Sequence, residues 1–148
     1  MLEVTVSGEE ALNKRLSALS DATFFDDLIA DCAQALFDQV EAAYAPHSKE
    51  GWLEKSLGAG PEQISPREYL IKSSGQVASY NIFAEFGSRP HRIYPNKRKM
   101  LRWVSGNGFV FAHFVDHPGY EGINAFNTAT TNVLRDFDKY AQKHMKDI

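Results

Sequence analysis

The chain contains a single cysteine, Cys32, in 148 residues. A lone cysteine excludes an intramolecular disulfide, and because Cys32 stands among apolar residues at helical spacing, we expect a buried structural thiol and not a nucleophile. No apolar run approaches the roughly 20 residues of a membrane-spanning helix, so an integral membrane protein is not expected. The first seven residues alternate apolar and polar side chains, which is typical of a strand and not of a signal peptide.

Charge of one sign is missing from the middle of the chain. Residues 87–115 contain six basic residues and no acidic one, whereas residues 1–43 contain nine acidic residues and two basic ones. The basic segment has three interpretations: a nucleic-acid site, solvated surface charge, or half of a head-to-tail ring in which the acidic face of one subunit meets the basic loop of the next. We favour the ring, because the chain has a net charge of −3 and would repel phosphates at long range.

Length and composition are those of a folded globular protein. Hydrophobic residues make up 43% and charged residues 24% of the chain, and aromatic residues contribute 12%, which argues against disorder. A chain of this size buries roughly 68–70% of its unfolded surface and so forms a substantial core. We expect one domain over residues 1–148, with no internal repeat.

Hydrophobic periodicity predicts the secondary structure. Helices are expected over residues 9–19, from about 21 to 43, where Pro46 bars continuation, and over about 124–146. Strands are expected over residues 2–6, 67–74, 100–104 and 109–115, the last two joined by a turn at 105–108. Residues 46–62 read as a loop with a short helical turn or strand at 52–57, and residues 77–86 fit a strand or a short helix. The fold class that follows is α+β: a mostly antiparallel sheet of about four to five strands flanked by a long N-terminal helix and a C-terminal helix.

Histidines are the first candidates for chemistry. His113 and His117 have the spacing of helical zinc ligands, but in a strand four residues span roughly 13 Å, too far for one ion. An acid–base site could in principle be formed from Glu85, His91, His113 and Asp116. Their spacing in the sequence does not require that they meet. We therefore predict no catalytic residue, no metal site and no cofactor.

The basic run Lys97-Arg98-Lys99 lies near Tyr94 and Trp103, a combination that can bind nucleic acid by charge and stacking. The alternative is a solvated loop whose aromatic side chains turn into the core. We interpret the phenylalanines at 109, 111 and 114 as core and interface residues and not as a ligand-binding set.

An ordered series of short motifs runs through the second half of the chain. It consists of Tyr80-x-x-Phe83-x-Glu85-Phe86-Gly87-Ser88, His91-x-Ile93-x-Pro95, Lys99-Met100-Leu101-x-Trp103, a glycine turn, Val110 and Val115-x-His117-Pro118-Gly119. This series resembles the head–tail joining, or tail-completion (tail terminator), proteins of long-tailed lambda-like bacteriophages and related prophages. The likeness covers about a third of the chain closely, and the order of elements extends it to nearly all of it. Ser88 stands where threonine is commoner, and Asn124-Ala125-Phe126 stands where Pro-Phe often starts the last helix.

The resemblance implies a non-enzymatic virion protein that ends tail-tube polymerisation and joins tail to head by forming a ring, commonly a hexamer. Its implied partners are other copies of itself, the tail-tube protein and the head connector or neck protein, with DNA only passing through the ring lumen and no membrane involved. The implied location is the tail or neck of the virion, and the host cytoplasm during assembly.

The loop from Ser88 to Lys99 is the expected interaction element. Its expected contact residues are Arg89, His91, Arg92, Tyr94, Lys97, Arg98 and Lys99. The expected structural motif residues are Glu85, Gly87, His117, Pro118 and Gly119. Glycines supply unusual backbone geometry and prolines stiffen loops that must dock in one shape.

Three alternatives stay open at this point. Within the same class, a neck or stopper protein of the head connector would show a similar pattern. In a different class, His91, His113, His117 and the cationic run favour a small metal-dependent hydrolase of nucleic acid. A plain DNA-binding module is the third.

Overall fold

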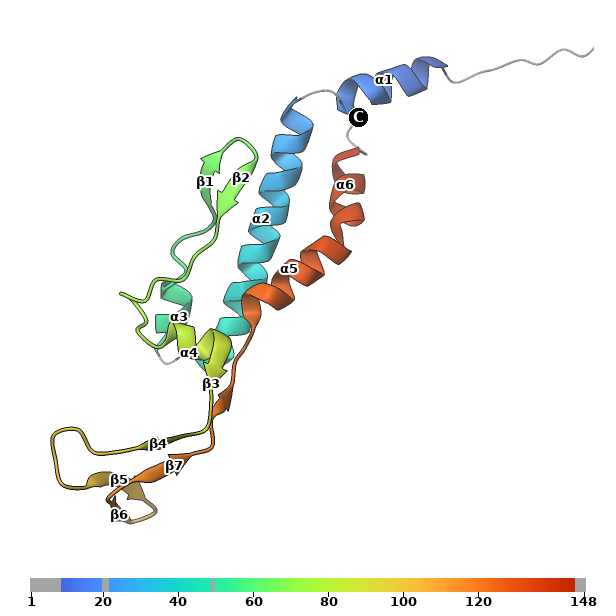
Figure 1. Ribbon diagram of the computed structural model, residues 1–148. Coiled ribbons are helices and arrows are strands. Elements are labelled where there is room, and N and C mark those ends of the chain that lie inside the picture. Colours follow the sequence, from blue (N-terminus) through green and yellow to red (C-terminus); the bar gives the residue numbers. More distant parts are fainter. Residues whose placement is uncertain (1–8, 20–21, 49, 146–148) are drawn as a thin grey trace, which may run out of the picture. The chain divides into compact units, whose positions relative to one another are not determined.

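The computed structural model describes residues 9–19, 22–48 and 50–145 (Figure 1). The strand predicted over residues 2–6 lies outside them. The chain forms two compact units: one joins Met1–Asn81 to Asn124–Ile148, here the helical unit, and the other is Ile82–Ile123, here the ribbon unit. Among the described residues, no helix is long and apolar enough to span a membrane.

The helical unit is organised around one long helix. The helix α1 is Glu9–Leu19 and α2 is Ala22–Tyr44, both close to the predicted bounds. The α2 side chains that enter the core recur at helical spacing: Phe24, Leu28, Phe37, Val40 and Tyr44. The helix ends where expected, because Pro46 falls in the short 3-10 helix η1 (Ala45–His47) and cannot donate a backbone hydrogen bond.

The C-terminal helix predicted as one element is two helices, α5 (Ala125–Arg135) and α6 (Phe137–Met145). They meet at Asp136, whose φ of −94° and ψ of 6° lie outside the α region. The Asp136 carboxylate accepts hydrogen bonds from Arg135 and from Lys139, which lower its pKa to about 2. Periodicity alone did not reveal this break, because the apolar stripe continues through it.

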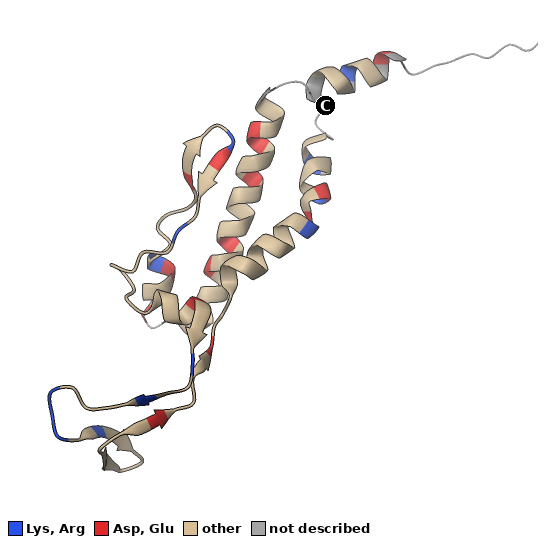
Figure 2. Ribbon diagram, in the orientation of Figure 1, with Lys and Arg blue, Asp and Glu red and all other residues tan. Residues whose placement is uncertain are grey.

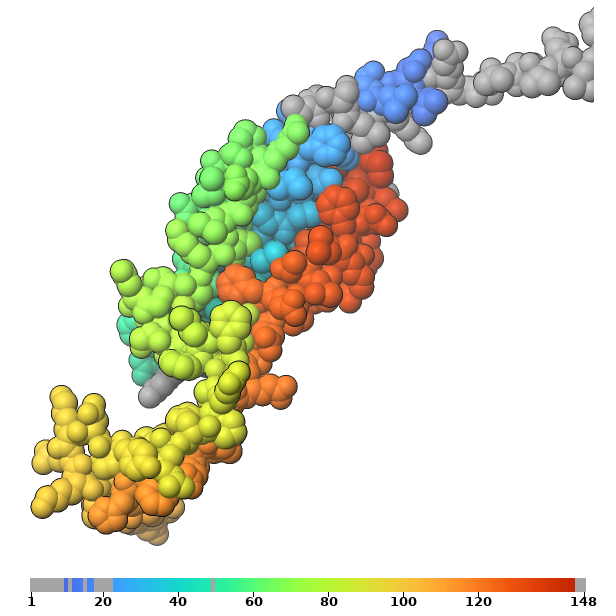
Figure 3. All heavy atoms as spheres, viewed as in Figure 1, coloured from blue at the N-terminus to red at the C-terminus, as the bar shows by residue number. Residues whose placement is uncertain are grey.

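Both C-terminal helices pack on α2 (Figure 3). Ala129 and Val133 are buried, and the rings of Tyr44 and Phe126 meet edge to face with centroids 6.3 Å apart. At the other end, Asp31 on α2 accepts hydrogen bonds from Lys143 at 2.6 Å and His144 at 3.0 Å. The Lys143 ammonium is the main cause of the lowered pKa of Asp31.

The remainder of the helical unit lies against α2. Of the helical turn or strand predicted at 52–57, the structure contains the helical form, α3 (Trp52–Lys55), which buries Leu53 completely. The strands β1 (Glu62–Ser65) and β2 (Glu68–Leu70) form an antiparallel hairpin. Arg67 in its turn donates a hydrogen bond to Asp26 at 2.8 Å, which fixes the hairpin to α2.

The ribbon unit is built from nested antiparallel pairs that follow α4 (Asn81–Phe86). The strand β3 (Gly87–Ser88) pairs with β8 (Tyr120–Glu121), β4 (His91–Ile93) with β7 (Val115–His117), and β5 (Leu101–Ser105) with β6 (Gly108–Ala112). We call residues 87–121 the β-ribbon. The α+β class with antiparallel pairing is confirmed, and within the described residues the strands are arranged as four two-stranded sheets.

Three glycines allow the two limbs of the β-ribbon to meet at its base. Gly87 has φ +77° and Gly119 has φ +88°, a region that other residues rarely adopt. A Cβ on Gly122 would overlap the carbonyl oxygen of Glu85. The predicted role of Gly87 and Gly119 in unusual backbone geometry therefore has a direct steric basis.

Gly122→Ala is expected to destabilise the base of the β-ribbon, because backbone atoms of Glu85 and Phe86 would have to move to admit the methyl group. The expected cost is about 1–3 kcal/mol. Amide hydrogen exchange at Ser88 and Tyr120, with thermal unfolding, measures it. Gly108→Ala is the matched control, since nothing lies within 4 Å of its Cβ position. Equal protection in both variants would contradict this account.

Candidate interaction surface on the β-ribbon

The β-ribbon contains a basic loop, which is an insertion in only one of its two limbs. The register of β3 with β8 continues without interruption into β4 with β7, whereas that of β5 with β6 is shifted. The shift arises because residues 94–100 in one limb lie opposite only residues 113–114 in the other. Residues 94–100, here the basic loop, contain Lys97, Arg98 and Lys99, all three exposed (Figure 2).

The tip of the β-ribbon, formed by β5 and β6 (101–112), exposes apolar residues on both faces. Residues paired across an antiparallel ladder share a face. Val104 pairs with Phe109 on one face, and their side chains are 68% and 57% exposed. On the other face Trp103 pairs with Val110, with 41% and 38% exposed. Ordinary exposed hairpins are polar on at least one face. Here both faces carry residue types that are typical of a protein core, but the side chains are exposed.

Phe111 is 56% exposed and Phe114 44%, so the expected core role of the phenylalanines at 109, 111 and 114 was wrong in this chain taken alone. Tyr94, at 64% exposed, likewise does not turn into a core. The missed signal is the run Phe109-Val110-Phe111-Ala112, which lacks the polar alternation of a strand with one solvated face.

Arg92 is held within the β-ribbon. Its guanidinium donates to both carboxylate oxygens of Asp116 on the paired strand, at 2.6 and 3.1 Å, and lies 4.1 Å from the centroid of the Phe114 ring. The Asp116 hydrogen bonds, and then Tyr94, raise the pKa of Arg92. Within the chain Arg92 fixes β4 against β7, and its expected contact with a partner stays a prediction.

The two histidines that lie together are His91 and His117. They are cross-strand partners whose ring centroids are 5.1 Å apart. The His91 Nδ1 lies 2.8 Å from the carbonyl oxygen of Arg89, and the Gly119 N–H donates to His117 Nδ1 at 3.1 Å. Backbone groups therefore occupy one nitrogen of each ring, which orients the imidazoles at the turn formed by Pro118 and Gly119. Across the described ranges, no group of three or more His, Cys, Asp or Glu side chains is placed to hold a metal ion.

The structure also places Glu85 and the remaining predicted contact cations. Glu85 is buried, with 5% of its surface exposed. Arg89, Lys97, Arg98 and Lys99 are exposed and take part in no ion pair with the residues that the structure describes. In this they differ from Arg92, which is paired with Asp116.

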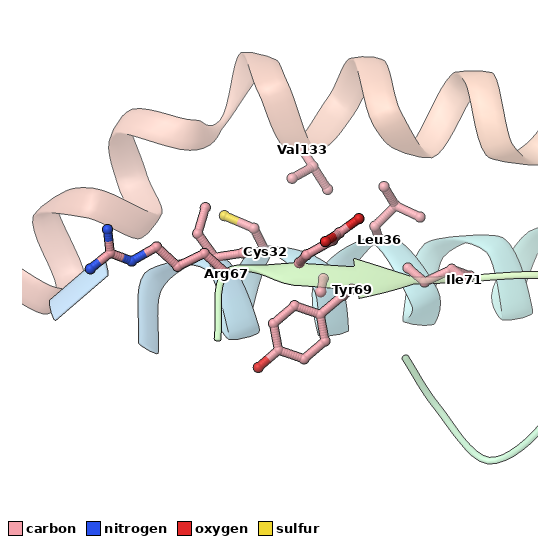
Figure 4. A pocket seen from close by; sticks show the side chains of 9 residues that line it. Cys32, Leu36, Arg67, Tyr69, Ile71 and Val133 are labelled. Carbon is pink, nitrogen blue, oxygen red and sulfur yellow. The ribbon is translucent and has the colours of Figure 1, made fainter. Parts of the chain in front are cut away.

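The helical unit contains an open cavity of about 330 Å³ between α2, β2 and α5 (Figure 4). Its lining is formed by Ile29, Cys32, Ala33, Leu36, Arg67, Glu68, Tyr69, Ile71 and Val133. Cys32 is half-buried, and burial raises the pKa of its thiol, which disfavours the nucleophilic thiolate. Arg67 is already paired with Asp26. The lining is mainly apolar, and we assign it no ligand.

Acidification is expected to loosen the middle of the β-ribbon. Hydrogen bonds from Arg92 hold the pKa of Asp116 below its ordinary value of 3.8. Because the folded pKa is the lower one, the contribution of this pair is fully present above about pH 3.8 and is lost as the pH falls through the folded value. Hydrogen exchange in β4 and β7, corrected for intrinsic rates, measures this loss. Asp116→Asn should remove the pH dependence, and Glu121→Gln, the control on β8, should retain it; the same profile in both variants would refute the assignment.

Comparison with protein-family models, curated proteins and solved structures found no significant match to this chain. The resemblance carried by the motif series therefore stays a prediction.

Proposed function

We propose that this chain is a structural bacteriophage protein of the head–tail junction, which ends tail-tube polymerisation and joins tail to head by assembling into a ring. The observation that carries the proposal is the β-ribbon tip, which exposes apolar side chains on both faces. The ordered motif series supplies the class of assembly.

An isolated two-stranded hairpin is at best marginally stable in water, and stability requires further strands or a packed layer. Contiguous exposed apolar surface marks protein–protein contacts. The β-ribbon combines both conditions, since Val104, Phe109 and Phe111 on one face and Trp103 on the other are left open to solvent. Covering both faces requires a partner on each side, which a ring or a stacked tube supplies.

The motif residues shared with tail-completion proteins support the same conclusion. Gly87 and Gly119 permit the close approach of the two limbs, and His117 accepts a hydrogen bond from the Gly119 backbone. These residues shape the β-ribbon, so the resemblance and the exposed surface concern the same element.

The proposed partners are other copies of the chain, in a ring that we expect to be hexameric, together with the tail-tube protein and the head connector. DNA would pass through the lumen. The proposed location is the virion neck or tail, with the host cytoplasm as the place of assembly. A neck or stopper role at the connector is the closest alternative, and it differs in which partner the ring caps.

Mixing the purified chain with polymerising tail-tube protein tests the role. We expect rings by negative-stain imaging, a multimeric mass in solution, and tubes whose growth stops with a ring at one end. A chain that stays monomeric and never joins tubes would overturn the proposal. Rings that bind the head connector and ignore tubes would favour the stopper role.

Phe109→Ser combined with Phe111→Ser is expected to weaken association while leaving the fold of the helical unit intact, because both residues are more than half exposed. We expect the dissociation constant of self-association to rise at least tenfold, as measured by sedimentation. The matched control is Ile64→Ser with Leu134→Ser, which removes two apolar side chains of the helical unit that are also more than half exposed. Equal loss in both double variants would show that the β-ribbon has no special role.

A further inference from the structure

The charges of the two units indicate which surface of the chain could bind the basic loop. We infer that the exposed acidic face of α2 in one copy of the chain receives the basic loop of the next copy. This inference rests on the self-association in the proposed function and adds the surface on which it occurs.

The acidic residues of α2 lie mostly on one face. The helix contains five acidic residues and no lysine or arginine. Asp27, Asp31, Asp38 and Glu41 follow one another at intervals of four, seven and three residues, which brings them to the same face of a helix with 3.6 residues per turn. This acidic stripe is about 21 Å long at 1.5 Å per residue.

Apart from Asp31, which contacts α6, the acidic stripe faces away from the packed side of α2. Cys32 and Leu36, which line the cavity under β2 and α5, stand on the opposite side of the helix by the same spacing. Asp27, Asp38 and Glu41 are all exposed. Figure 2 shows the acidic residues of α2 as red bands along the helix.

Most of the stripe's charge is not neutralised. Asp31 is paired with Lys143 and His144 of α6. Asp38 accepts a hydrogen bond from the neutral Gln34 at 2.7 Å. Neither Asp27, Asp38 nor Glu41 is in an ion pair with any residue that the structure describes.

Some cations of the ribbon unit are held by contacts within the chain, and others are exposed. Arg92 is bound to Asp116, and the Arg102 guanidinium lies 4.1 Å from the centroid of the Phe109 ring. The exposed cations outside any ion pair are concentrated in the basic loop, at Lys97, Arg98 and Lys99. The ribbon unit has six basic residues against three acidic ones, while the whole chain has a net charge of −3.

A second copy fits this surface better than a nucleic acid does. The negative charge that a basic loop needs is present on every copy of the chain, and the net negative charge repels phosphates at long range. Complementary patches set orientation and association rate, while the apolar tip supplies affinity. Because the two patches differ, the contact is head-to-tail, which is the kind that closes into rings.

Charge exchange between two variants tests the inference. The stripe variant carries Asp27→Lys and Asp38→Lys, and the loop variant carries Lys97→Glu and Arg98→Glu. Each variant alone places like charges against one another, so we expect self-association to weaken roughly tenfold or more at low salt. Mixed together, stripe and loop are again opposite in sign at every contact, so association should return.

The restored species has a specific signature. Every contact must join one variant to the other, so native mass spectrometry should find alternating assemblies with equal numbers of both. Glu10→Lys with Asp138→Lys is the matched control, because it makes the same charge change at exposed acids outside α2 and should associate as wild type. Circular dichroism checks that each variant is folded.

Two results would overturn the inference: a folded stripe variant that associates like wild type, or a mixture that does not recover. Failure of the proposed function looks different. In that case the mixture recovers its rings but neither it nor the wild-type chain stops tail tubes. If wild type caps tubes and the charge variants do so equally well, only the inference falls.

Discussion

The structure of this protein depends on one constraint: a two-stranded antiparallel ribbon cannot bury its own side chains. Each face of the β-ribbon tip presents apolar residues, with Val104 and Phe109 on one side and Trp103 and Val110 on the other. A second layer is required on each face to remove them from water. Taken alone, the chain leaves both faces of the β-ribbon tip uncovered, and the proposed assembly would cover them.

Polar contacts within the β-ribbon hold its shape without covering its surface. Arg92 and Asp116 join β4 to β7 on one face, and the imidazoles of His91 and His117 lie together on the other. Exposed ion pairs contribute little to stability, but they select one strand register. A ribbon that keeps its register before it docks loses less conformational entropy on binding.

The helical unit differs from the β-ribbon, because the apolar side of α2 is covered by other elements of the same chain. Val40, Tyr44 and Leu53 are almost completely buried, and α5 and α6 cover the side of α2 that the β1–β2 hairpin leaves open. Three members of the acidic stripe, Asp27, Asp38 and Glu41, are not used by this packing, whereas Asp31 binds α6. One unit thus supplies a stable body with a negative face, and the other supplies a cationic, apolar ribbon.

The sequence by itself determined the elements that rest on local chemistry. The spacing of apolar residues predicted α1 and α2, Pro46 predicted the end of α2, and residues 105–108 predicted the turn between β5 and β6. Only the tertiary structure decided whether an aromatic strand is covered, since a period of two is the same for a buried and an exposed ribbon. It also decided that Arg92 binds Asp116 and that His117 meets His91, because these contacts join residues more than twenty positions apart through a strand register that no local pattern specifies.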